Sequence, residues 1–527
     1  MYLHARSFQS GTFSMPLVSH RMPSIRPHGI LLSLLGAVVF APACTAATLT
    51  VVNNTSSGAG SLRQALLDAA PGDTIDFAAS LSGATIRAGH LGVGLLLSKN
   101  VVIDGSALPA RVSISGDSDG DGVGDVRVIF VDENVSATLK NLVIARGRTP
   151  GTGAGILNGG TLTLENCEVS QSTSTADNGG GIYSYGPMTV TGSVVSGNKA
   201  GQVGGGIYVA GTDVTLTNTT VSGNNGPAGG GGIFVAPIAT GTLTVVGGSI
   251  SDNTTLQEGG GILNQGLAAN LSGTLVSGNA STTSSGGGLA GSFVIDSSVI
   301  SNNTAAMNAG GIYADTLANV SVRNSTLAGN QAGPNSYGGA ILNRSLATTT
   351  LVNTTLSGNS GGYGGAIYNQ NNGVISMASV TMANNQSPNS GGIGGLANVG
   401  VVHFVNTLIA GSTNGDCAAL GPGSFPTRSG NLVQEGTCFA SSAFLSVMLG
   451  PLADNGGPTQ THALLPGSPA IDYGDNSYCD DNPGANNLDQ RGVTRPIDGD
   501  GIPGAVCDTG AFELVVQTGP IFASGFE

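Results

Sequence analysis

The sequence predicts an all-β solenoid in which short strands stack coil upon coil. Three observations support this fold class. A Gly-Gly-x-apolar step recurs along the middle of the chain, and a Ser-Gly-Asn-like step follows each copy in register. In addition, 87 of the 527 residues are Gly and only 9% are charged. A chain so poor in charge cannot be a coiled coil or a charged disordered polymer, and its Gly residues lack the period of collagen.

The N-terminal residues 1–46 are typical of an export signal. Residues 30–41 form an apolar stretch that is too short to span a bilayer, and Arg21 and Arg26 precede it. A lipoprotein signal ending at Cys44 is an open alternative. The signal predicts an exported protein that is extracellular or held at the cell surface, with outer-membrane association included. Because no other long apolar run follows, we do not expect an integral helical membrane protein.

Residues 47–150 are predicted to hold an N-terminal cap and the first, irregular coils. Ser61 is a good N-cap for a short amphipathic helix over residues 62–69, which Pro71-Gly72 would end. Such a helix would cover the open end of the first coil, as terminal coils require. Alternating apolar residues predict strands at 74–77, 101–104, 112–115 and 126–131.

Residues 151–413 form the repeat array. Its apolar residues recur at intervals of 23 to 29 residues, which is too short for the blades of a β-propeller. A unit of this length cannot close its own core, so we expect the apolar column to stack inside the coils. The column that we assign to the core comprises Ile182, Ile207, Ile233, Ile262, Ile312, Ile341 and Ile367.

A second column consists of asparagines. Each unit is predicted to fold as strand, turn, strand, turn, with the asparagine at one turn. Stacked side-chain amides can hydrogen-bond to one another, so we expect a turn ladder with a structural role. Its members are Asn198, Asn224, Asn253, Asn279, Asn303, Asn330, Asn359 and Asn385.

These repeats resemble those of right-handed, single-stranded parallel β-helices, the solenoid type of pectate lyases. The Gly-Gly-Gly-Ile-Tyr and Ser-Gly-Asn steps are similar to those of polymorphic outer-membrane and adhesin-like proteins, and residues 61–75 match the usual opening of exported members. The resemblance implies one long β-helix with a capping helix.

The segment 414–513 is predicted to be a small C-terminal module, followed by a tail at 514–527. Pro becomes more frequent here, and four cysteines gather: Cys417, Cys438, Cys479 and Cys507. Because an exported chain enters an oxidising compartment, we expect two disulfides. Proximity in sequence favours Cys417–Cys438 and Cys479–Cys507 over the other two pairings. Cys167, inside a repeat strand, is expected to be a buried free thiol.

The same module resembles the choice-of-anchor Q domain of exported bacterial β-helix proteins. The resemblance rests on residues 450–472, Asp489-Gln-Arg-Gly (489–492) and Cys507-Asp-Thr-Gly-Ala-Phe-Glu (507–513). That family is named for its attachment to varied anchoring tails, and no catalytic residues are attributed to it. The resemblance therefore implies a surface-associated protein.

One acidic motif predicts a metal site. Asp117, Asp119, Asp121 and Asp125 occupy positions 1, 3, 5 and 9 of a loop with Gly122 at position 6, as at the front of an EF-hand-like or dockerin-like calcium loop. Val128 stands where the final Glu would be, so the loop is partial. Calcium is the one cofactor that the sequence indicates, and an acidic solvent-exposed insertion is the alternative.

The charge and the motifs together favour a binding function. The net charge of -14 argues against nucleic acid as a partner. The acids of the repeats, such as Asp252, Asp296 and Asp315, do not recur in register, so we name no catalytic residue. We expect a non-catalytic protein that binds or adheres to an extracellular polymer, a glycan or a cell surface. The alternative is a polysaccharide lyase or a glycoside hydrolase, because many β-helices are such enzymes.

Overall fold

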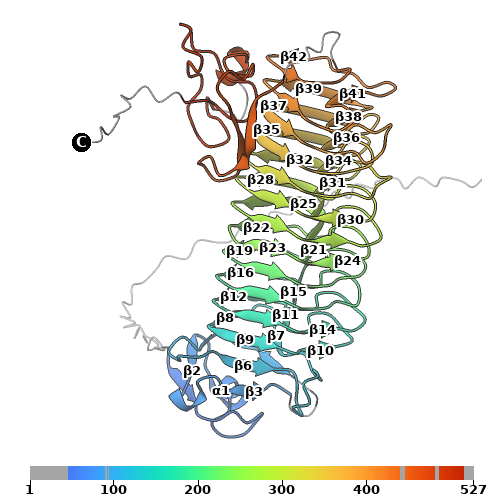
Figure 1. Ribbon diagram of the computed structural model, residues 1–527. Coiled ribbons are helices and arrows are strands. Elements are labelled where there is room, and N and C mark those ends of the chain that lie inside the picture. The colour runs from blue at the N-terminus through green and yellow to red at the C-terminus, as the bar shows by residue number, and fades with distance from the viewer. Residues whose placement is uncertain (1–45, 90–91, 93, 439–445, 481–485, 516–527) are drawn as a thin grey trace, which may run out of the picture. The chain divides into compact units, whose positions relative to one another are not determined.

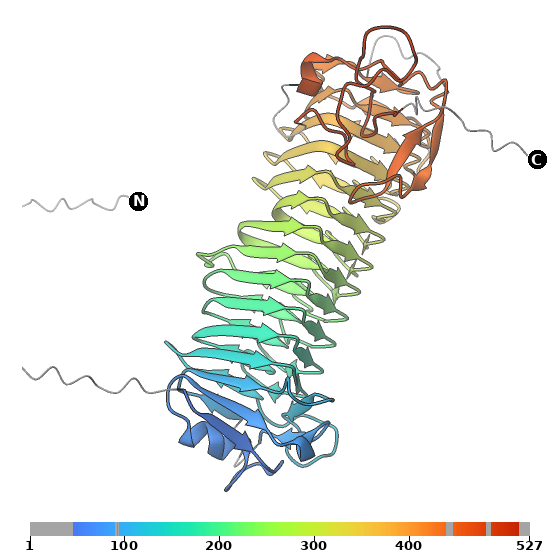
Figure 2. The same cartoon turned by 90° about the vertical axis from the view of Figure 1, so that its left-hand side faces the viewer.

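The computed structural model describes residues 46–515, except for 90–91, 93, 439–445 and 481–485. The predicted export signal therefore lies outside the described residues but for Ala46, and the tail lies outside them beyond residue 515. From Ala46 onward the chain forms one compact unit. Within this unit, coils of short strands stack into a rod (Figures 1 and 2).

Three columns of parallel strands run along the rod, and beyond the first, incomplete coils each coil contributes one strand to each column. The first column contains β4 (Leu95–Leu97), β7 (Ile129–Val131), β11 (Ile156–Asn158), β15 (Ile182–Ser184), β18 (Ile207–Val209), β21 (Ile233–Val235), the starts of β25 (Ile262–Ser272) and β28 (Leu289–Asp296), β31 (Ile312–Ala314), β34 (Ile341–Asn343), β36 (Ile367–Asn369), β38 (Leu396–Asn398) and β41 (Cys417–Ala419).

The second column contains β1 (Thr48–Val51), β2 (Asp73–Phe77), β5 (Val101–Asp104), β8 (Ser136–Lys140), β12 (Thr161–Glu165), β16 (Met188–Thr191), β19 (Val214–Thr217), β22 (Leu243–Val246), the ends of β25 and β28, β32 (Asn319–Arg323), the starts of β35 (Thr348–Ser357) and β37 (Val374–Ala383), β39 (Val401–Val405) and β42 (Arg428–Ser429).

The third column contains β3 (Thr85–Arg87), β6 (Val112–Ser115), β9 (Leu142–Ala145), β13 (Glu168–Ser170), β17 (Val194–Ser196), β20 (Thr220–Ser222), β23 (Ser249–Ser251), β26 (Leu275–Ser277), β29 (Val299–Ser301), β33 (Thr326–Ala328), the ends of β35 and β37, β40 (Leu408–Ala410) and β43 (Leu432–Val433). Short extra pairings lie beside it: β10 (Arg148–Thr149) with β14 (Thr173–Ser174), and β24 (Thr254–Thr255), β27 (Ala280–Ser281) and β30 (Thr304–Ala305) with one another.

The third column corrects the predicted two-strand unit. Between β19 and β20 the chain bends at a single residue, Asn218, whose φ of 46° is left-handed. Asn adopts this conformation more readily than most residues. Because one residue makes the bend, the sequence shows no loop there, and the strands before and after it read as one segment.

The predicted apolar column lies inside the coils. Ile182, Ile207, Ile233 and Ile262 pair in register along the first column, and each is completely buried. Ile312, Ile341 and Ile367 continue the same column and are also completely buried. Adjacent coils thus share one continuous apolar core.

The predicted asparagine column forms a hydrogen-bonded ladder. The Nδ2 of Asn198 donates to Oδ1 of Asn224 at 3.0 Å, and Asn224 donates to Asn253 at 2.9 Å. The pattern continues coil by coil to Asn385, and all eight side chains are completely buried. Each ladder amide also donates to a backbone carbonyl, as Asn198 does to Val169 at 2.9 Å. The column therefore satisfies polar groups that the turn would otherwise bury unpaired.

Helix α1 (Leu62–Asp68) closes the N-terminal end of the rod (Figure 1). Ser61 caps it, and the backbone N–H of Gln64 donates to the Ser61 hydroxyl at 3.2 Å. Leu62 and Leu66 are buried and belong to the core of the first coils. A short 3₁₀ helix, η1 (Ala79–Leu81), follows β2. The last predicted strand of this region begins at Ile129 rather than at Val126.

The sheet continues one coil beyond the predicted end of the array at residue 413. Strands β41, β42 and β43 pair with β38, β39 and β40 and complete that coil. The Cys417–Cys438 disulfide therefore belongs to the last coil, whereas Cys479–Cys507 lies in the module that follows. Both predicted disulfides are confirmed. Cys167 is a buried free cysteine.

The C-terminal module folds back along the side of the last coils (Figures 1 and 2). It contains the antiparallel pair β44 (Leu449–Ala453) and β45 (Thr461–Leu464) and the short helix α2 (Ser477–Asp480). Its seat is the outward face of the third column, where five side chains pair in register from coil to coil: Thr326, Thr355, Thr381, Leu408 and Leu432.

Polar contacts hold the module on this seat. The Thr355 hydroxyl donates to Oε1 of Gln490 at 2.7 Å, and the backbone N–H of Ala511 donates to the Thr381 hydroxyl at 2.8 Å. Farther along, Leu408 packs in an apolar cluster with Phe512. Gln490 and Phe512 belong to two of the three segments on which the resemblance of the module rests, so these two segments serve in docking.

Candidate functional site

An apolar ladder lines the outer side of the first column. Its residues each follow an inward Ile or Leu, or Cys417 in the last coil, so the strand alternation turns them away from the core. They pair in register along the rod, and the central ones form a second apolar cluster, separate from the core. We call this set the outer ladder: Leu96, Phe130, Leu157, Tyr183, Tyr208, Phe234, Leu263, Ala290, Tyr313, Leu342, Tyr368, Ala397 and Ala418.

Tyrosines concentrate on this side of the rod. The rings of Tyr183 and Tyr208 stack with centroids 4.5 Å apart, and Phe234 continues the stack at 5.1 Å. A second group joins Tyr337 to Tyr368 at 4.4 Å. Because the stacked rings cover one another's faces, they mainly stiffen this side of the rod. Tyr185, which is tilted against Tyr183, is exposed.

A row of exposed aliphatic side chains runs beside the outer ladder. Each lies five residues after an inward Ile. Three of them follow the end of the first-column strand, whereas Leu267 lies within the long strand β25. Leu317 is 74% exposed and Leu346 is 55% exposed. We call the row the apolar ridge: Ile238, Leu267, Leu317 and Leu346.

Two ridge leucines have a strained backbone. Leu317 and Leu346 have φ of 66° and 65°, in the left-handed region that a branched side chain disfavours by about 1 kcal/mol. Other coils place asparagines at the same offset, Asn134 with φ 63° and Asn372 with φ 62°. A Leu that is both strained and exposed does not stabilise the fold, which points to a role in contact with a partner.

A pocket opens at the middle of the outer ladder, where the repeat is shortest. Its volume is about 240 Å³, and its lining includes Ala290, Glu258, Asp315 and Leu317. The hollow exists because β28 runs from the first column into the second without a turn and carries Ala290-Gly291 where the preceding coil has Leu263-Asn264. A side chain at Gly291 would place its Cβ 2.0 Å from the carbonyl oxygen of Asn264. We call this hollow the central pocket.

The charged groups of the central pocket are coupled. Nη1 of Arg344 lies 2.7 Å from Oδ1 of Asp315 and donates to the hydroxyl of Tyr313 at 3.0 Å. Burial and then the charge of Asp315 raise the pKa of Glu258, although Arg344 opposes them. Burial and then Asp315 also raise the pKa of Tyr313. The pocket thus combines a carboxyl group that retains its proton more readily than usual with a carboxylate held by an arginine.

The predicted calcium loop lies between β6 and β7. Carboxylate oxygens of Asp117, Asp119 and Asp125 lie within 4.8 Å of one another, but Asp121 is outside this group. Hydrogen bonds within the loop also hold its turn. Asp117 accepts the backbone N–H groups of Gly120 at 2.6 Å and Gly122 at 3.0 Å. Both glycines have positive φ, 89° and 91°, so the expected sharp turn is present.

Basic groups also surround this loop. Nη1 of Arg146 lies 3.8 Å from Oδ2 of Asp117, and a Cβ at Gly120 would lie 2.2 Å from Nη2 of Arg87. Hydrogen bonds from Ser118 lower the pKa of Asp125. The donor set is therefore suited to a hard cation, but the arginines neutralise part of its charge.

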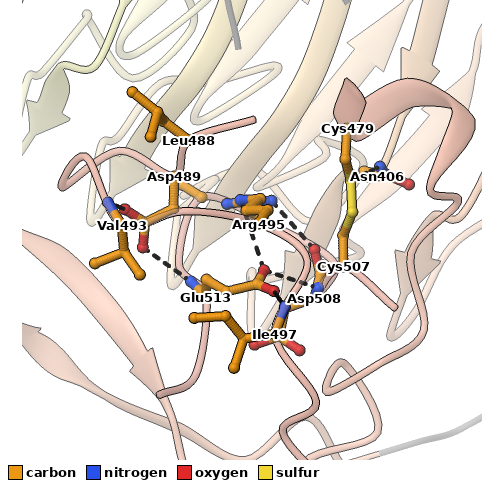
Figure 3. Close-up of polar contacts among 12 residues, drawn as sticks. Asn406, Cys479, Leu488, Asp489, Val493, Arg495, Ile497, Cys507, Asp508 and Glu513 are labelled. Carbon is orange, nitrogen blue, oxygen red and sulfur yellow. Dashed lines mark hydrogen bonds and ion pairs between the residues drawn. A yellow bond between two sulfur atoms is a disulfide. The ribbon is translucent and has the colours of Figure 1, made fainter. Parts of the chain in front are cut away.

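A second group of buried charges lies inside the C-terminal module (Figure 3). Arg495 Nε is 3.6 Å from Oε2 of Glu513, and both side chains are almost completely buried. Burial raises the pKa of Glu513 to about 7, although Arg495 acts to lower it. Burial likewise raises the pKa of Asp508 to about 6. These groups hold loops of the module together, and none of the three lines a described pocket.

Sequence reasoning missed the residues of the central pocket and the ridge. Asp315 was noted only as a scattered acid, and Glu258 was not singled out. A signal for the ridge did exist, because an Ile-Ala or Leu-Ala step stands five residues after Ile233, Ile262, Ile312 and Ile341.

Comparisons with known proteins bear on the fold. Residues 127–292 match the model of the right handed beta helix region. The protein is a right-handed parallel β-helix. Among solved structures, it is similar to the crystal structure of the pectate lyase Pel9A, with 13% identity and a TM-score of 0.30, over 89% of this chain and 96% of that one. No curated protein matches the sequence.

The described residues hold no helix long and apolar enough to cross a bilayer. The helices of the described residues are all short: the cap α1, the 3₁₀ helix η1, and α2 in the C-terminal module.

Proposed function

We propose that this β-helix binds an extended extracellular glycan along the apolar ridge. The observation that carries the proposal is the pair Leu317 and Leu346, which are exposed and have a strained backbone. Leu317 also lines the central pocket. Contiguous exposed apolar side chains mark contact surfaces on soluble proteins.

The spacing of the ridge suits a polymer. Neighbouring coils lie about 4.8 Å apart, which is comparable to the length of one sugar ring. Sugar rings have apolar C–H faces that aliphatic and aromatic side chains can cover, and hydroxyl groups that polar side chains can bind. Repeated weak contacts along one chain add up to firm retention.

The charge of this surface favours a neutral polymer over an acidic one. The charge of Asp177 contributes to the raised pKa of Tyr183 in the tyrosine stack. Glu258 and Asp315 line the central pocket, where Arg344 pairs with Asp315. The whole chain carries a net charge of -14. Polyanions such as uronate polymers would be repelled. This argues against the lyase alternative, since a lyase of uronate polymers must attract such a chain.

Export and surface attachment belong to the same proposal. The signal-like N-terminus and the disulfides both suit an oxidising compartment. The C-terminal module, with its resemblance to an anchor domain, would hold the rod at the cell surface so that the ridge meets polymer. Fractionation of the producing cells tests this location.

The binding test replaces the strained leucines with asparagine. We expect Leu317→Asn combined with Leu346→Asn to lower retention on insoluble neutral polysaccharides by at least about tenfold, because two exposed apolar contacts are lost. Thermal stability should stay equal or rise, since Asn tolerates the left-handed backbone better than Leu. Retention is measured by sedimentation with the polymer.

The matched control is Ile502→Asn in the C-terminal module, where Ile502 is 68% exposed but lies outside the ridge. This control should retain polymer as the unmodified protein does. Equal retention by the double variant, or equal loss in the control, would refute a binding role for the ridge.

A further inference from the structure

We infer that the central pocket binds a sugar unit that carries a free amino group, with Glu258 as the carboxylate that receives the ammonium. The inference rests on the proposed function, because the glycan must first lie along the apolar ridge, and it names the chemical class of that glycan. Leu317 belongs both to the ridge and to the lining of the pocket, so one chain of sugars can contact the two together.

Glu258 supplies the charge of the pocket that has no partner. Its side chain is half-buried, and its carboxyl group makes no hydrogen bond or ion pair among the described residues. Arg344 also acts on Glu258, but it is already bound to Asp315 at 2.7 Å and to the hydroxyl of Tyr313 at 3.0 Å. Glu258 and Asp315 against Arg344 therefore leave one negative charge without compensation. A half-buried charge without a partner is costly, and a cation in the pocket would remove this cost.

An ammonium group and the carboxylate of Glu258 would stabilise each other. Burial and then the charge of Asp315 raise the pKa of Glu258. A bound ammonium acts in the opposite direction, because an opposite charge nearby favours the ionised carboxylate. Hydrogen bonds between ionised groups are also about twice as strong as those between neutral groups. Glu258 would thus prefer a ligand with an ammonium group over the same ligand without one.

The rest of the lining suits a hydroxylated ring better than a lysine side chain. The side-chain amide of Gln265 and the hydroxyl of Thr316 line the pocket, and neither has a hydrogen-bond partner in the described part of the chain. Leu317 adds exposed apolar surface at the same place. A sugar ring offers hydroxyl groups to the first two residues and a C–H face to the third. The stem of a lysine is aliphatic and would leave the two polar groups unused.

The volume of the pocket limits the ligand to a single sugar unit. The pocket measures about 240 Å³, below the roughly 300–1,000 Å³ of pockets that hold drug-sized ligands. Ala290 makes room for this unit, because the residues in register with it on the neighbouring coils are the larger Leu263 and Tyr313. The units before and after it would remain outside, on the ridge.

The experiment compares short oligomers of glucosamine and of N-acetylglucosamine by their affinity for the disulfide-bonded protein at mildly acidic pH. The two oligomers share one backbone, and only the first carries free ammonium groups. We expect the glucosamine oligomer to bind at least about tenfold more tightly, because it gains a charge-assisted hydrogen bond.

Glu258→Gln should remove this preference, because the amide keeps the size of the side chain and loses its charge. The variant should melt at the unmodified temperature, since the carboxyl group makes no hydrogen bond to the described residues. Asp252→Asn is the matched control, because Asp252 is exposed on the same coil but lies outside the pocket. It removes the same charge from an acidic chain, which would attract a cationic oligomer at any point of its surface. This control should keep the preference.

Equal affinity for the two oligomers, or binding of neither, would overturn the inference. Equal loss of preference in Glu258→Gln and Asp252→Asn would overturn it as well, because the attraction would then belong to the whole surface. Oligolysine that binds as tightly as the glucosamine oligomer, and depends equally on Glu258, would identify a basic protein segment as the occupant instead. Retention on neutral polysaccharides is measured in parallel, so the proposed function of the ridge can stand when the inference fails.

Discussion

At the residue scale, Asn279 shows how a single polar side chain joins three coils. Its Nδ2 donates to the carbonyl of Ile250 at 2.8 Å and to Oδ1 of Asn303 at 2.9 Å. Its own Oδ1 accepts from the Asn253 side chain at 2.9 Å and from the Asn253 backbone at 3.0 Å. The ladder therefore adds hydrogen bonds between coils to those of the strand pairing beside it.

We expect Asn279→Ala to destabilise the coils around it by about 2–4 kcal/mol, because several buried groups lose their partners at once. Amide hydrogen exchange should accelerate in β23, β26 and β29 and much less near α1, since a solenoid couples mainly neighbouring units. Asn335→Ala, at an exposed loop position, is the control. If amide exchange in Asn279→Ala is no faster than in Asn335→Ala, the ladder is dispensable for stability.

At the scale of one element, calcium binding by the acidic loop between β6 and β7 stays a prediction. Asp117, Asp119 and Asp125 gather their oxygens, whereas Asp121 is outside the group, so the site would hold the ion with fewer protein ligands than expected. We expect weak binding that stabilises the first coils.

The measurement for calcium is the melting temperature in millimolar calcium and in EDTA. A ligand at 100 times its dissociation constant adds about 2.7 kcal/mol of stability, and the midpoint should rise accordingly. Asp119→Asn should abolish the response, and Asp252→Asn should keep it. Identical melting of the unmodified protein in calcium and in EDTA would rule out the ion as a stabilising ligand.

The C-terminal module is predicted to lose stability as pH rises. Its buried Glu513 has a pKa raised to about 7 and its Asp508 a pKa raised to about 6, both by burial first. The folded module therefore binds more protons than the unfolded chain between about pH 4 and pH 7. Stability is fully present below this window and declines across it. One pKa unit corresponds to about 1.4 kcal/mol.

We expect the module to unfold more readily at pH 8 than at pH 5. Hydrogen exchange in β44 and β45 measures this difference. Glu513→Gln should reduce this dependence on pH, because one of the two acids with a strongly raised pKa is then removed. The backbone N–H of Asp508 donates to Glu513 at 3.0 Å, and an amide N–H of the Gln would face it, so the variant loses stability at every pH. The slope of stability against pH is therefore the quantity to compare. A slope of opposite sign would mean that Arg495 dominates over burial.

At the scale of the whole molecule, the sequence predicts what repeats and misses what varies. The Ile and Asn columns recur in register, so the stacking of coils is readable from Ile182 or Asn198 onward. The third strand column is hidden because its bends are often single residues of different types, such as Asn218 and Gly273. Strict repetition of residue type would have revealed it.

The pocket and the fold-back of the module escape prediction for a related reason. Glu258 and Asp315 line one hollow where β28 runs between two columns without a turn, and spacing alone does not reveal which coil does so. The contact between Ala511 and Thr381 spans 130 residues. No local pattern indicates which face of the rod such a distant segment will cover.

The seat of the C-terminal module has a mechanical consequence for a protein that is held at one end. Strands run across the rod, so tension along its axis would peel free coils away one after another. The module, however, bonds to Thr326, Thr355 and Thr381 on three successive coils. A pull on the C-terminus would therefore load several coils in shear at once. In single-molecule stretching from both ends, we expect the coils before β33 to unravel at lower force than those that the module spans. Gln490→Ala should narrow this difference. A tether built in this way would let the ligand-facing coils yield before the attachment does.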